Sequence, residues 1–510
     1  MGSAERTRPG LLGIDAGTSG CKIAVFSYAG EMLASAYRAY DAAGGDAGRA
    51  ELDAAAVWEA IYEALGEVTA LAPGVAIKAL SVSSLGEAVV PVTAARQILG
   101  PSILNFDARG AQFLAPLAGV LPAERLYGIN GNTLGNHYSL TKLKWLQRHQ
   151  PALYERTYKF LPWGAFIAFM LGGEAAVDYS LANRTLLFDL RAETWSDQLL
   201  EDVGLDGGKL PRTVPAGTVI GRVAAPVAAE LGWSQDVAIV AGAHDQCANA
   251  LGCGVIEAGS AVYGMGTFHC ITPVFERQPA PQLMMAQGLN TEHHAVPDRY
   301  VSFIYNQGGS LVKWFRQTFA AAEYEAAVAA GKDIYPALLA EMPAEPSRVL
   351  VLPHFTTTGP PEFIADSAGV IAGLRLHTTR GDILKGIIEG AAYYLKEVVD
   401  DLPAAGIEIA DYRAAGGGSR SDTWVQTCAD IFGQAITRPV ITEAGALGAA
   451  IVAGVGSGVF NSYAEGVGQM VKLECTFAPD PRRHEQYQNR YEDYRQMWPL
   501  LGDYLRSLGG

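Results

Sequence analysis

Two strand pairs with glycine at their tips constrain the fold more than any other feature of this sequence. The segments LLGIDAGTSGCKIAVF (11–26) and SAVYGMGTFHCITPVF (260–275) are each typical of two strands joined by a tight turn. Gly17 and Thr18 stand at the tip of the first turn, and Gly266 and Thr267 at the tip of the second. This weak internal repeat predicts two halves of related architecture, with a boundary near residue 250.

The chain is long enough for two domains, each with its own core. Its 510 residues exceed what one hydrophobic core usually supports, and 49% of them are hydrophobic. Helical periodicity at residues 53–71 and 380–402 lies between strand-like segments, and residues 139–151 predict a short surface helix that begins at a serine cap. We therefore expect an α/β protein with domains at residues 1–250 and 251–510.

The charge balance narrows the choice of partners. A formal net charge of −15 argues against nucleic acid or an anionic membrane as the main partner, because both require clustered Lys and Arg. The six cysteines are scattered without a CxxC pair, and no apolar stretch approaches the ~20 residues of a membrane span. We expect a cytoplasmic protein that acts on a small molecule, and a homodimer is among the assemblies that the sequence leaves open.

The first glycine turn, DAGTSG (15–20), has the groups that bind phosphate. Its backbone N–H groups and the hydroxyls of Thr18 and Ser19 can contact phosphate oxygens, and Asp15 can hold Mg²⁺ directly or through a water molecule. The alternative is a hairpin in which Asp15 and Thr18 satisfy only their own turn.

A third glycine-rich turn, GGGS (416–419), lies between an expected strand and an expected helix. Open backbone and a helix N-terminus in that order can receive a phosphate or the face of a nucleotide. The sequence contains neither a GxxxxGK[ST] loop nor a GxGxxG after a strand. A nucleotide would therefore be held by these turns across a cleft.

An ionisable residue, Asp245, interrupts the small apolar run AGAHDQCANA (241–250). It follows an apolar strand, where the carboxyl ends of an α/β sheet offer a place for a ligand. A carboxylate there can accept the proton of a substrate hydroxyl while that oxygen attacks phosphorus. The alternative is an aspartate that only caps a helix.

Together these segments resemble the FGGY family of carbohydrate kinases, within the actin-like ATPase superfamily. The resemblance extends from residue 11 to about residue 491. Its blocks are GIDAGTSGCK (13–22), NFDARG (105–110), TKLKWLQRH (141–149), AGAHDQCANALGCG (241–254), GMGT (264–267), GVIAGL (369–374), AAGGGSRSDTWVQTCADIFG (414–433) and EAGALGAAIVAGVG (443–456). It implies two actin-like (ribonuclease H-like) ATPase domains, with ATP and Mg²⁺ in an interdomain cleft. The N-terminal domain would then hold the sugar and the catalytic base, and the C-terminal domain the nucleotide.

Roles at the nucleotide follow from the resemblance position by position. It implies that Asp245 is the catalytic base and that Asp15 attends Mg²⁺. The implied phosphate contacts are Gly17, Thr18, Ser19, Gly266 and Thr267. Gly417, Gly418 and Ser419 match the adenosine motif, and Asp422 stands where a polar residue often lies near the adenine.

The resemblance also implies a set of residues at the sugar hydroxyls. These are Glu87, Asp107, Arg109, His137 and Gln246. A polyol is selected by charged and amide groups that converge on its hydroxyls, because an analogue leaves those groups unpaired. For Asp107 and Arg109 the alternative is a local ion pair that holds their loop.

Departures from the family pattern leave the substrate open. His137 stands where an aromatic or small residue is usual, and Phe106 follows Asn105 where the family has tryptophan. D-xylulose is the first candidate substrate. The alternatives are L-fuculose, ribulose, glycerol or erythritol, gluconate and the autoinducer-2 precursor. A non-catalytic actin-fold sugar sensor and a chaperone-like ATPase are the hypotheses from other classes.

Overall fold

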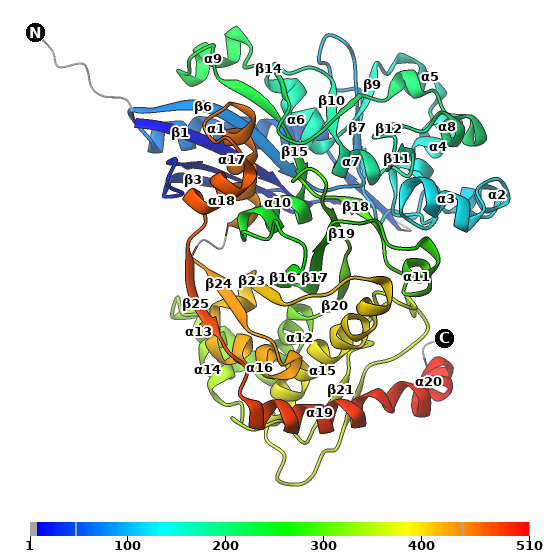
Figure 1. The fold of residues 1–510 in the computed structure, drawn as a ribbon, viewed down its shortest axis with the longest axis vertical. Coiled ribbons are helices and arrows are strands. Elements are labelled where there is room, and N and C mark those ends of the chain that lie inside the picture. The colour runs from blue at the N-terminus through cyan, green and yellow to red at the C-terminus, as the bar shows by residue number, and fades with distance from the viewer. Residues whose placement is uncertain (1–7, 46–47, 441–442, 509–510) are drawn as a thin grey trace, which may run out of the picture. The chain divides into compact units, whose positions relative to one another are not determined.

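The computed structural model describes residues 8–45, 48–440 and 443–508. The chain divides into two compact units (Figure 1). Unit 1 comprises Met1–Ile256, Asn290–Val301 and Glu443–Lys472, and unit 2 comprises Glu257–Leu289, Ser302–Thr442 and Leu473–Gly510. Each unit is therefore assembled from three separate stretches of the chain. The assignment of the sugar to residues 1–250 and of the nucleotide to residues 251–510 stays a prediction.

Unit 1 is built on a six-stranded sheet in the order β14-β15-β6-β1-β2-β3. Its strands are β1 (Arg8–Ala16), β2 (Gly20–Phe26), β3 (Met32–Ala39), β6 (Val75–Ser84), β14 (Val219–Arg222) and β15 (Ala238–His244). Strand β6 runs parallel to β1 and β15, whereas β1, β2 and β3 form the expected antiparallel meander and β14 is antiparallel to β15. Apolar residues of β1, β2, β6 and β15 are buried in one core.

Unit 2 repeats this arrangement with strands from later in the chain. They are β16 (Ser260–Met265), β17 (Phe268–Phe275), β20 (Ile304–Gln307), β23 (Asp411–Ala415), β24 (Ile436–Pro439) and β25 (Leu473–Phe477). Strand β16 pairs antiparallel with β17 and parallel with β23, β24 runs parallel to β23, and β20 and β25 add antiparallel strands to β17 and β24. The order β20-β17-β16-β23-β24-β25 has the same directions as β3-β2-β1-β6-β15-β14. This confirms the prediction of two related halves.

Two of the three expected helices form as their sequence pattern predicts. Helix α1 (Ala54–Leu71) begins after Asp53, whose carboxylate accepts from the N–H groups of Ala55 and Ala56, and its apolar face is buried. Helix α15 (Arg380–Asp401) begins with a capping box at Thr379. Helix α4 (Ser139–His149) forms as well, but its expected surface position and serine cap are wrong. Six of its residues are buried, and the Ser139 hydroxyl donates to the carbonyl oxygen of Glu87 at 2.5 Å.

Helix α17 (Ala444–Gly456, orange in Figure 1) belongs to unit 1, although it comes from the last of the three stretches that form this unit. It packs on β1 and on α10 (Asp245–Gly252) through backbone contacts that only glycine allows. A Cβ atom at Gly13 would lie 1.8 Å from the carbonyl oxygen of Ala446, and one at Gly448 would lie 1.9 Å from that of Ala248. The small residues of EAGALGAAIVAGVG therefore bring this helix against the end of the sheet that carries Asp15 and Asp245.

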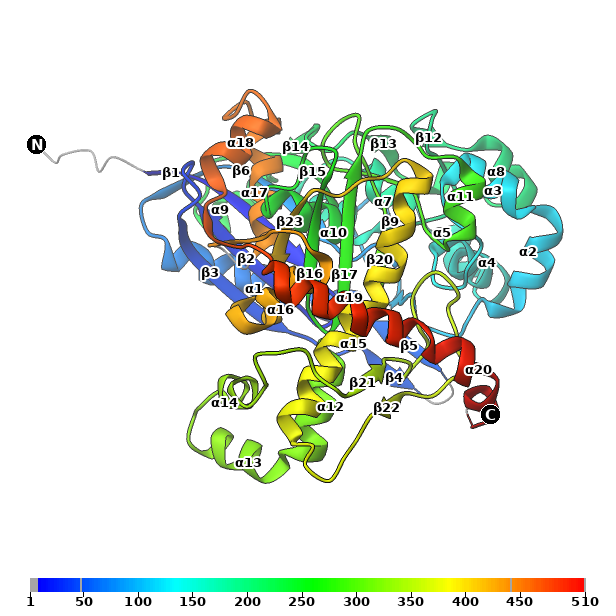
Figure 2. The same cartoon turned by 60° about the horizontal axis from the view of Figure 1, so that its bottom comes forward.

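Helices α12 (Gly309–Phe319), α15 and α16 (Asp422–Phe432) pack around the sheet of unit 2. Figure 2 shows α19 (Pro481–Arg495) crossing α15. At that crossing the ring of Tyr393 lies 5.7 Å from the ring of Tyr491 and 5.3 Å from that of Tyr494. The expected strand, glycine turn and helix at residues 411–432 are present as β23, a 3₁₀ turn (Gly417–Arg420) and α16.

The remaining elements connect these layers. In unit 1 they are β4 (Ala43–Gly45), β5 (Arg49–Leu52), β7 (Val89–Val92), β8 (Ser102–Ile103), α2 (Leu114–Val120), α3 (Ala123–Asn130), α5 (Pro151–Arg156), β9 (Lys159–Pro162), α6 (Trp163–Leu171), β10 (Ala176–Asp178), α7 (Tyr179–Asn183), β11 (Phe188–Asp189), β12 (Thr194–Trp195), α8 (Asp197–Val203), β13 (Arg212–Val214), α9 (Ala225–Leu231), β18 (Glu292–His293), β19 (Tyr300–Val301) and α18 (Tyr463–Met470). In unit 2 they are α11 (Pro281–Ala286), α13 (Ala321–Ala329), α14 (Tyr335–Ala340), β21 (Leu350–Leu352), β22 (Val370–Ala372) and α20 (Met497–Leu508).

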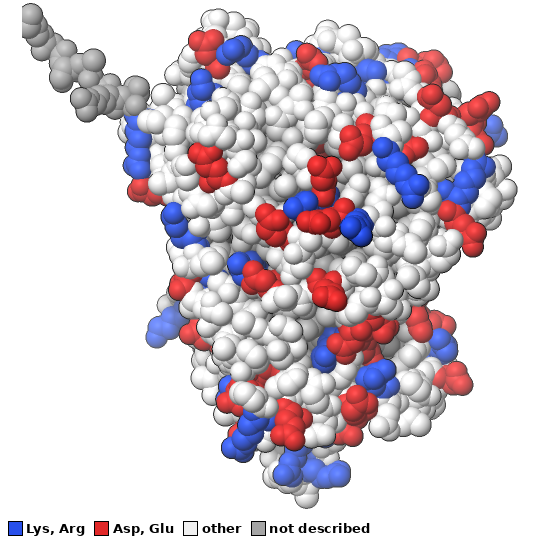
Figure 3. Space-filling model, viewed as in Figure 1, with Lys and Arg blue, Asp and Glu red and all other residues white. Residues whose placement is uncertain are grey.

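Acidic and basic side chains are interspersed over the face that Figure 3 shows. Exposed ion pairs occur among the described residues, such as Arg212 with Glu174 at 2.8 Å. Among the described residues, no helix is both long and apolar enough to cross a membrane.

Candidate active site

The carboxyl ends of three parallel strands bring the candidate residues of unit 1 together. Asp15 lies near the end of β1 and is paired in register with Ser83 of β6, and His244 at the end of β15 is paired with Ser84. Asp245 follows β15 directly, and Glu87 lies in the loop that follows β6. Parallel strands end at the same edge of a sheet, so three carboxylates from distant parts of the sequence meet at this edge.

Asp15 is held from the neighbouring strand and not from its own turn. The Ser83 hydroxyl donates to Asp15 Oδ1 at 2.6 Å, and the backbone of Gly445 packs so closely that a Cβ atom there would lie 2.4 Å from Asp15 Oδ2. Burial raises the pKa of Asp15 to about 7, the bond from Ser83 opposes that rise, and the charges of Asp245 and Glu443 add to it. A partly exposed carboxylate beside two other carboxylates fits a divalent cation, which would relieve their repulsion.

The turn after Asp15 has the expected form. The N–H of Gly17 donates to the carbonyl oxygen of Gly20 at 2.9 Å, and the Tyr40 hydroxyl donates to the carbonyl oxygen of Gly17 at 2.8 Å. Thr18 and Ser19 are exposed at the tip. Their hydroxyls are thus accessible to a ligand.

Asp245 is the first residue of α10, and His244 occupies the cap position before it. In the described part of the chain no side chain caps this helix, so the alternative of a merely capping aspartate is wrong. The Asp245 side chain is 33% exposed at the sheet edge. Burial raises its pKa, the charge of His244 lowers it, and the charge of Glu87 raises it again. A carboxylate with a raised pKa is a better proton acceptor, provided that it stays ionised.

His244 lies between two carboxylates. Its Nδ1 is 2.8 Å from Glu292 Oε1, and its Nε2 is 3.3 Å from Asp245 Oδ1. Burial lowers the pKa of His244, but the charges of Glu292 and Asp245 outweigh that effect and raise the pKa to about 9. The imidazole is therefore a cation at neutral pH.

The Glu292 carboxylate also contacts a thiol. Cys247 Sγ lies 3.4 Å from Glu292 Oε1, and the ligand atoms of His244, Cys247 and Glu292 lie within 4.8 Å of one another, as in a metal site. Burial raises the pKa of the Cys247 thiol well above its usual range, and the nearby charge of Glu292 raises it further. The Cys247 thiol donates to Glu292, which also bonds to His244, so we interpret the three groups as a hydrogen-bonded cluster.

A buried arginine joins Glu87 to this cluster. The Arg184 guanidinium donates from Nε to Glu87 Oε1 at 3.0 Å, and its Nη1 lies 3.4 Å from Glu292 Oε2. Burial raises the pKa of Glu87, but the charges of Arg184 and His244 outweigh that effect and lower the pKa to about 2. Glu87 is therefore ionised, and its second oxygen, Oε2, lies 3.4 Å from the amide nitrogen of Asn105.

Two further predicted sugar contacts lie near Glu87 and Asp245. His137 is exposed, with its ring 4.0 Å from the ring of Tyr138. Gln246, half-buried, follows Asp245 in α10 and forms a hydrogen bond with its carboxylate. Both side chains belong to the polar surroundings of the sheet edge.

Asp107 and Arg109 form the ion pair that was the alternative to a sugar contact. Arg109 Nη2 lies 2.6 Å from Asp107 Oδ2, which also accepts from the N–H of Ala50 at 2.6 Å, and the guanidinium pairs with Glu51 as well. Lys142 Nζ donates to the carbonyl oxygens of Asp107 and Arg109, both at 2.7 Å. The Asp107 carboxylate is fully buried, and this network fixes the loop from which Asn105 faces Glu87 and Phe106 is 64% exposed.

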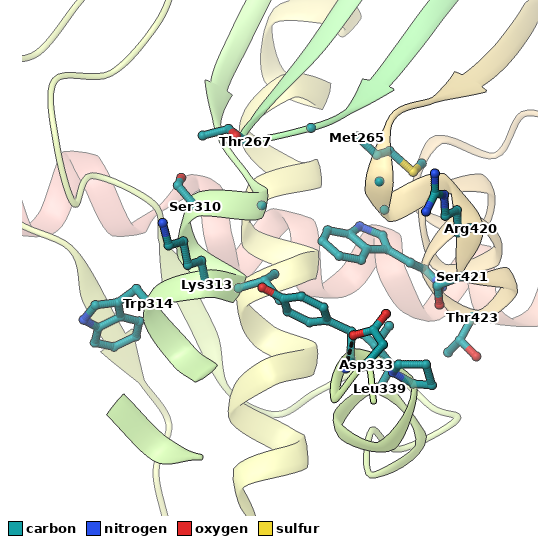
Figure 4. Close-up of a pocket in the computed structure, with 18 of the residues that line it drawn as sticks. Met265, Thr267, Ser310, Lys313, Trp314, Asp333, Leu339, Arg420, Ser421 and Thr423 are labelled. Carbon is teal, nitrogen blue, oxygen red and sulfur yellow. Dashed lines mark hydrogen bonds between the residues drawn. The ribbon is translucent and has the colours of Figure 1, made fainter. Parts of the chain in front are cut away.

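Unit 2 contains a cavity of about 1080 Å³ that collects the other predicted residues (Figure 4). Gly266, Thr267, Gly417 and Gly418 line it. Figure 4 shows Ser310 and Lys313 on one side and Arg420, Ser421 and Thr423 on the opposite side, with Asp333 and Leu339 at a third edge. Two cations, several hydroxyls and an apolar wall thus surround one space.

Glycine backbones form one wall of this cavity. A Cβ atom at Gly416 would lie 3.0 Å from the backbone of Met265, and one at Gly309 would lie 2.5 Å from the carbonyl oxygen of Gly266. A Cβ atom at Gly417, by contrast, would meet nothing within 4 Å. Trp424 also lines the cavity and is 5% exposed, yet its indole N–H has no hydrogen-bond partner among the described residues. Open space and an unpaired buried donor fit a bound nucleotide.

Two residues predicted to contact the adenosine, Ser419 and Asp422, form hydrogen bonds within the protein. The Ser419 hydroxyl donates to the carbonyl oxygen of Gly416 at 2.7 Å, and the side chain is buried. Asp422 accepts from Arg438 Nη1 at 2.9 Å. Neither residue is among those that line the cavity.

Sequence reasoning missed Arg184 and Glu292 in unit 1, and Lys313, Arg420 and Trp424 in unit 2. The signal for Arg184 and Glu292 was weak, because each is a single charged residue in a short connecting segment, ANRT or NTEHH. Lys313 lies on α12, which begins at Gly309, and Trp424 lies on α16, which begins at Asp422 after the turn at residues 416–420. Because both residues closely follow these glycine-containing segments in sequence, they could have been expected to line the same cavity.

The two α/β sheets of the same order are those of the two-domain actin-like, ribonuclease H-like fold. The chain belongs to the FGGY family of carbohydrate kinases, whose N-terminal domain matches residues 11–252 and whose C-terminal domain matches residues 259–457. It is therefore an ATP-dependent carbohydrate kinase. Kinases of this family use ATP, with Mg²⁺ as the usual metal.

Individual relatives are similar along nearly the whole chain. A xylulose kinase from Escherichia coli is 28% identical over 498 residues, which covers 96% of this chain and 99% of the relative. An autoinducer-2 kinase from Salmonella paratyphi B is 29% identical over 506 residues, with coverage of 96% and 94%. The crystal structure of a xylulose kinase from Rhodospirillum rubrum is 26% identical, with a TM-score of 0.86 and coverage of 97% and 99%.

Proposed function

We propose that the protein transfers the terminal phosphate of ATP to a hydroxyl of D-xylulose or a related sugar or polyol, with Asp245 as the general base. The position of Asp245 carries this proposal. Its carboxylate is partly exposed at the carboxyl end of a parallel strand, at the same sheet edge as Asp15 and Glu87.

The base is needed because a sugar hydroxyl is a very weak acid at neutral pH. Asp245 accepts the hydroxyl proton as the sugar oxygen forms its bond to phosphorus and the bond to the departing ADP oxygen breaks. The raised pKa of Asp245 suits it to this transfer. A positioned base typically supplies about 10²- to 10⁴-fold of rate, which corresponds to about 3 to 5 kcal/mol of barrier.

Asp15 fits the role of holding Mg²⁺. Its carboxylate is kept in place by Ser83 and lies among like charges that a cation would neutralise. When bound, Mg²⁺ offsets the negative charge that develops on the phosphate oxygens. The exposed hydroxyls of Thr18 and Ser19, on the turn beside Asp15, are then the proposed phosphate contacts of unit 1.

The cavity of unit 2 fits the nucleotide. The N–H group and the hydroxyl of Thr267 can contact phosphate oxygens beside Gly266, and the charges of Lys313 and Arg420 favour an anion. Gly417 and Gly418 leave room for the ring system next to Trp424. The reaction requires that a nucleotide bound here can present its terminal phosphate to the hydroxyl at Asp245.

The polar groups around Asp245 suit a molecule with several hydroxyls. Glu87, Asn105, His137 and Gln246 offer both acceptors and donors. D-xylulose is favoured because relatives of nearly full coverage are named xylulose kinases. The autoinducer-2 precursor is the second candidate, because a relative of similar identity is named autoinducer-2 kinase.

The substitution Asp245→Asn tests the role of the base. We expect at least about a 100-fold loss of sugar-dependent ADP release, since an amide cannot accept the proton, while the Kd for ATP stays within about two-fold. Asp236→Asn is the matched control, because Asp236 is an exposed aspartate just before the same strand. Sugar phosphorylation retained by the Asp245 variant would remove Asp245 from the base role.

A coupled ADP-release screen tests the substrate. It would compare D-xylulose, L-fuculose, ribulose, glycerol, erythritol, gluconate and the autoinducer-2 precursor at equal concentration. We expect the highest kcat/KM with D-xylulose. A higher kcat/KM with another compound would replace D-xylulose.

A further inference from the structure

We propose that His244 and Glu292 are positioning residues for Asp245, and that the array Glu292–His244–Asp245 fixes the orientation of the base and keeps it ionised. This inference rests on the proposed function, in which Asp245 accepts the substrate proton. It assigns a task to two buried residues that need not touch the sugar, the nucleotide or the metal.

The geometry of His244 carries the inference. Its two ring nitrogens face two different carboxylates, with Nδ1 2.8 Å from Glu292 Oε1 and Nε2 3.3 Å from Asp245 Oδ1. The main chain of His244 is tied by its N–H, which donates to the Ser180 hydroxyl at 2.8 Å. The ring is also confined by Gly86, where a Cβ atom would lie 2.9 Å from Nε2. The imidazole therefore has little freedom to turn away from Asp245.

The carboxylate of Glu292 explains why His244 is a cation here. Glu292 is fully buried and is held by Arg184 and Cys247 as well as by His244. Among the described residues, the charged groups that act on His244 include Asp245, Glu87, Asp178, Arg184 and Glu292. Four of these five groups are carboxylates, so the imidazolium is strongly favoured.

An imidazolium beside Asp245 has two consequences for catalysis. Its Nε2 forms an ion pair with Asp245 Oδ1 at 3.3 Å, which holds that oxygen toward His244 and leaves Oδ2 to accept the proton of the substrate hydroxyl. It also opposes the effect of burial, which otherwise favours the protonated carboxyl. A protonated Asp245 could not act as a base, so the cation keeps the enzyme active at neutral and mildly acidic pH.

The substitutions Glu292→Gln and His244→Gln test the inference through the pH dependence of kcat/KM for the sugar. Without the charge of Glu292, His244 loses its proton at lower pH, and without His244 the cation is absent. In His244→Gln the pKa of Asp245 rises, so we expect the acid limb of the profile to move to higher pH by about one unit and activity on that limb to fall about ten-fold. In Glu292→Gln the direct loss of a negative charge lowers the pKa of Asp245 while the weakened imidazolium raises it, so we expect a smaller shift than in His244→Gln.

Cys247→Ala is the matched control, because it removes a contact of Glu292 and leaves both contacts of His244 in place. His293→Gln is a second control, since this buried histidine bonds to the carbonyl oxygen of Leu190. We expect both controls to keep the wild-type acid limb. Nucleotide binding and the melting temperature would be measured for every variant. A His244→Gln variant that fails to fold would be replaced by His244→Asn, for which the acid limb should move in the same direction.

The outcomes separate this inference from the proposed function. If Asp245→Asn is inactive but the acid limb stays in place in folded His244→Gln and Glu292→Gln, the positioning role is wrong and the base role stands. If Asp245→Asn is active, the proposed function fails first. If the purified wild type carries one metal ion per chain that Glu292→Gln loses, the cluster of His244, Cys247 and Glu292 is a metal site and the inference is overturned.

Discussion

Replacing Arg184 by methionine should destabilise unit 1 by a large amount that depends on pH. Arg184 lies between Glu87 and Glu292, and the side chains of the three residues are 9%, 10% and 0% exposed. Methionine keeps most of the volume of the side chain but removes its charge. Two buried carboxylates would then lose their shared cation.

The size of the effect follows from Glu87. The surrounding charges lower its pKa from 4.5 to about 2, which corresponds to about 3 kcal/mol of stabilisation at neutral pH. Removing one partner of a buried ion pair typically costs about 3 to 5 kcal/mol. We expect a loss in this range, offset in part because His244 continues to attract both carboxylates.

The pH dependence has a definite direction. In the wild type, the stabilisation due to the lowered pKa of Glu87 is complete above about pH 4.5 and is lost as the pH falls toward 2. In Arg184→Met the pKa of Glu87 rises, because burial is then opposed by less positive charge. The carboxyl can be neutralised by a proton at mildly acidic pH. The variant should therefore lose more free energy of unfolding, relative to the wild type, at pH 8 than at pH 5.

Hydrogen–deuterium exchange of peptides from residues 238–252 measures this loss of stability near the candidate site. At pH 8 we expect exchange through unfolding of unit 1 to be faster by about 100-fold or more than in the wild type. The double variant Arg184→Met with Glu87→Gln should recover part of the protection, because one unpaired charge is gone. Equal deficits at pH 5 and pH 8, or no recovery in the double variant, would refute this reasoning.

Two further predictions concern the nucleotide and the metal. Gly417→Ala should raise the KM for ATP about ten-fold without loss of stability, because the added Cβ enters open space in the cavity. The control Gly468→Ala, at an exposed position of α18, should leave the KM for ATP unchanged. Asp15→Asn should raise the Mg²⁺ concentration for half-maximal activity at least about ten-fold while the KM for the sugar changes little, and initial rates over a magnesium titration measure this.

The sequence could predict those parts of the fold that depend on local pattern. The glycine turns and the apolar alternation around Asp15 and Met265 define strand pairs, and they are present as expected. The surface position expected for α4 was wrong for a physical reason. Lys142 is buried because its ammonium group donates to two carbonyl oxygens of the loop at residues 105–110. A helical pattern does not reveal such a partner.

The candidate site shows the same limit. Asp15 and Asp245 could be found because Asp15 lies near the end of an apolar strand and Asp245 directly follows one. Glu292 could not, because it lies in a short segment whose place beside β15 and α10 depends on the whole of unit 1. Asp107 and Arg109 stood out in the sequence, and the structure shows them bonded to each other, to Ala50 and to Glu51, while their contact with the sugar stays a prediction.

The buried charges make substrate selection and catalysis interdependent. Glu87 shares Arg184 with Glu292, and Glu292 holds the imidazole that faces Asp245. Neutralising Glu87 would let Arg184 bind Glu292 more strongly, and Glu292 would then favour the imidazolium of His244 less. A change made at Glu87 to alter the preferred sugar would thus also alter the base. Asn105 and His137 lie outside the Glu292–His244–Asp245 array, so they offer positions where recognition of hydroxyls can change while the proton transfer is preserved.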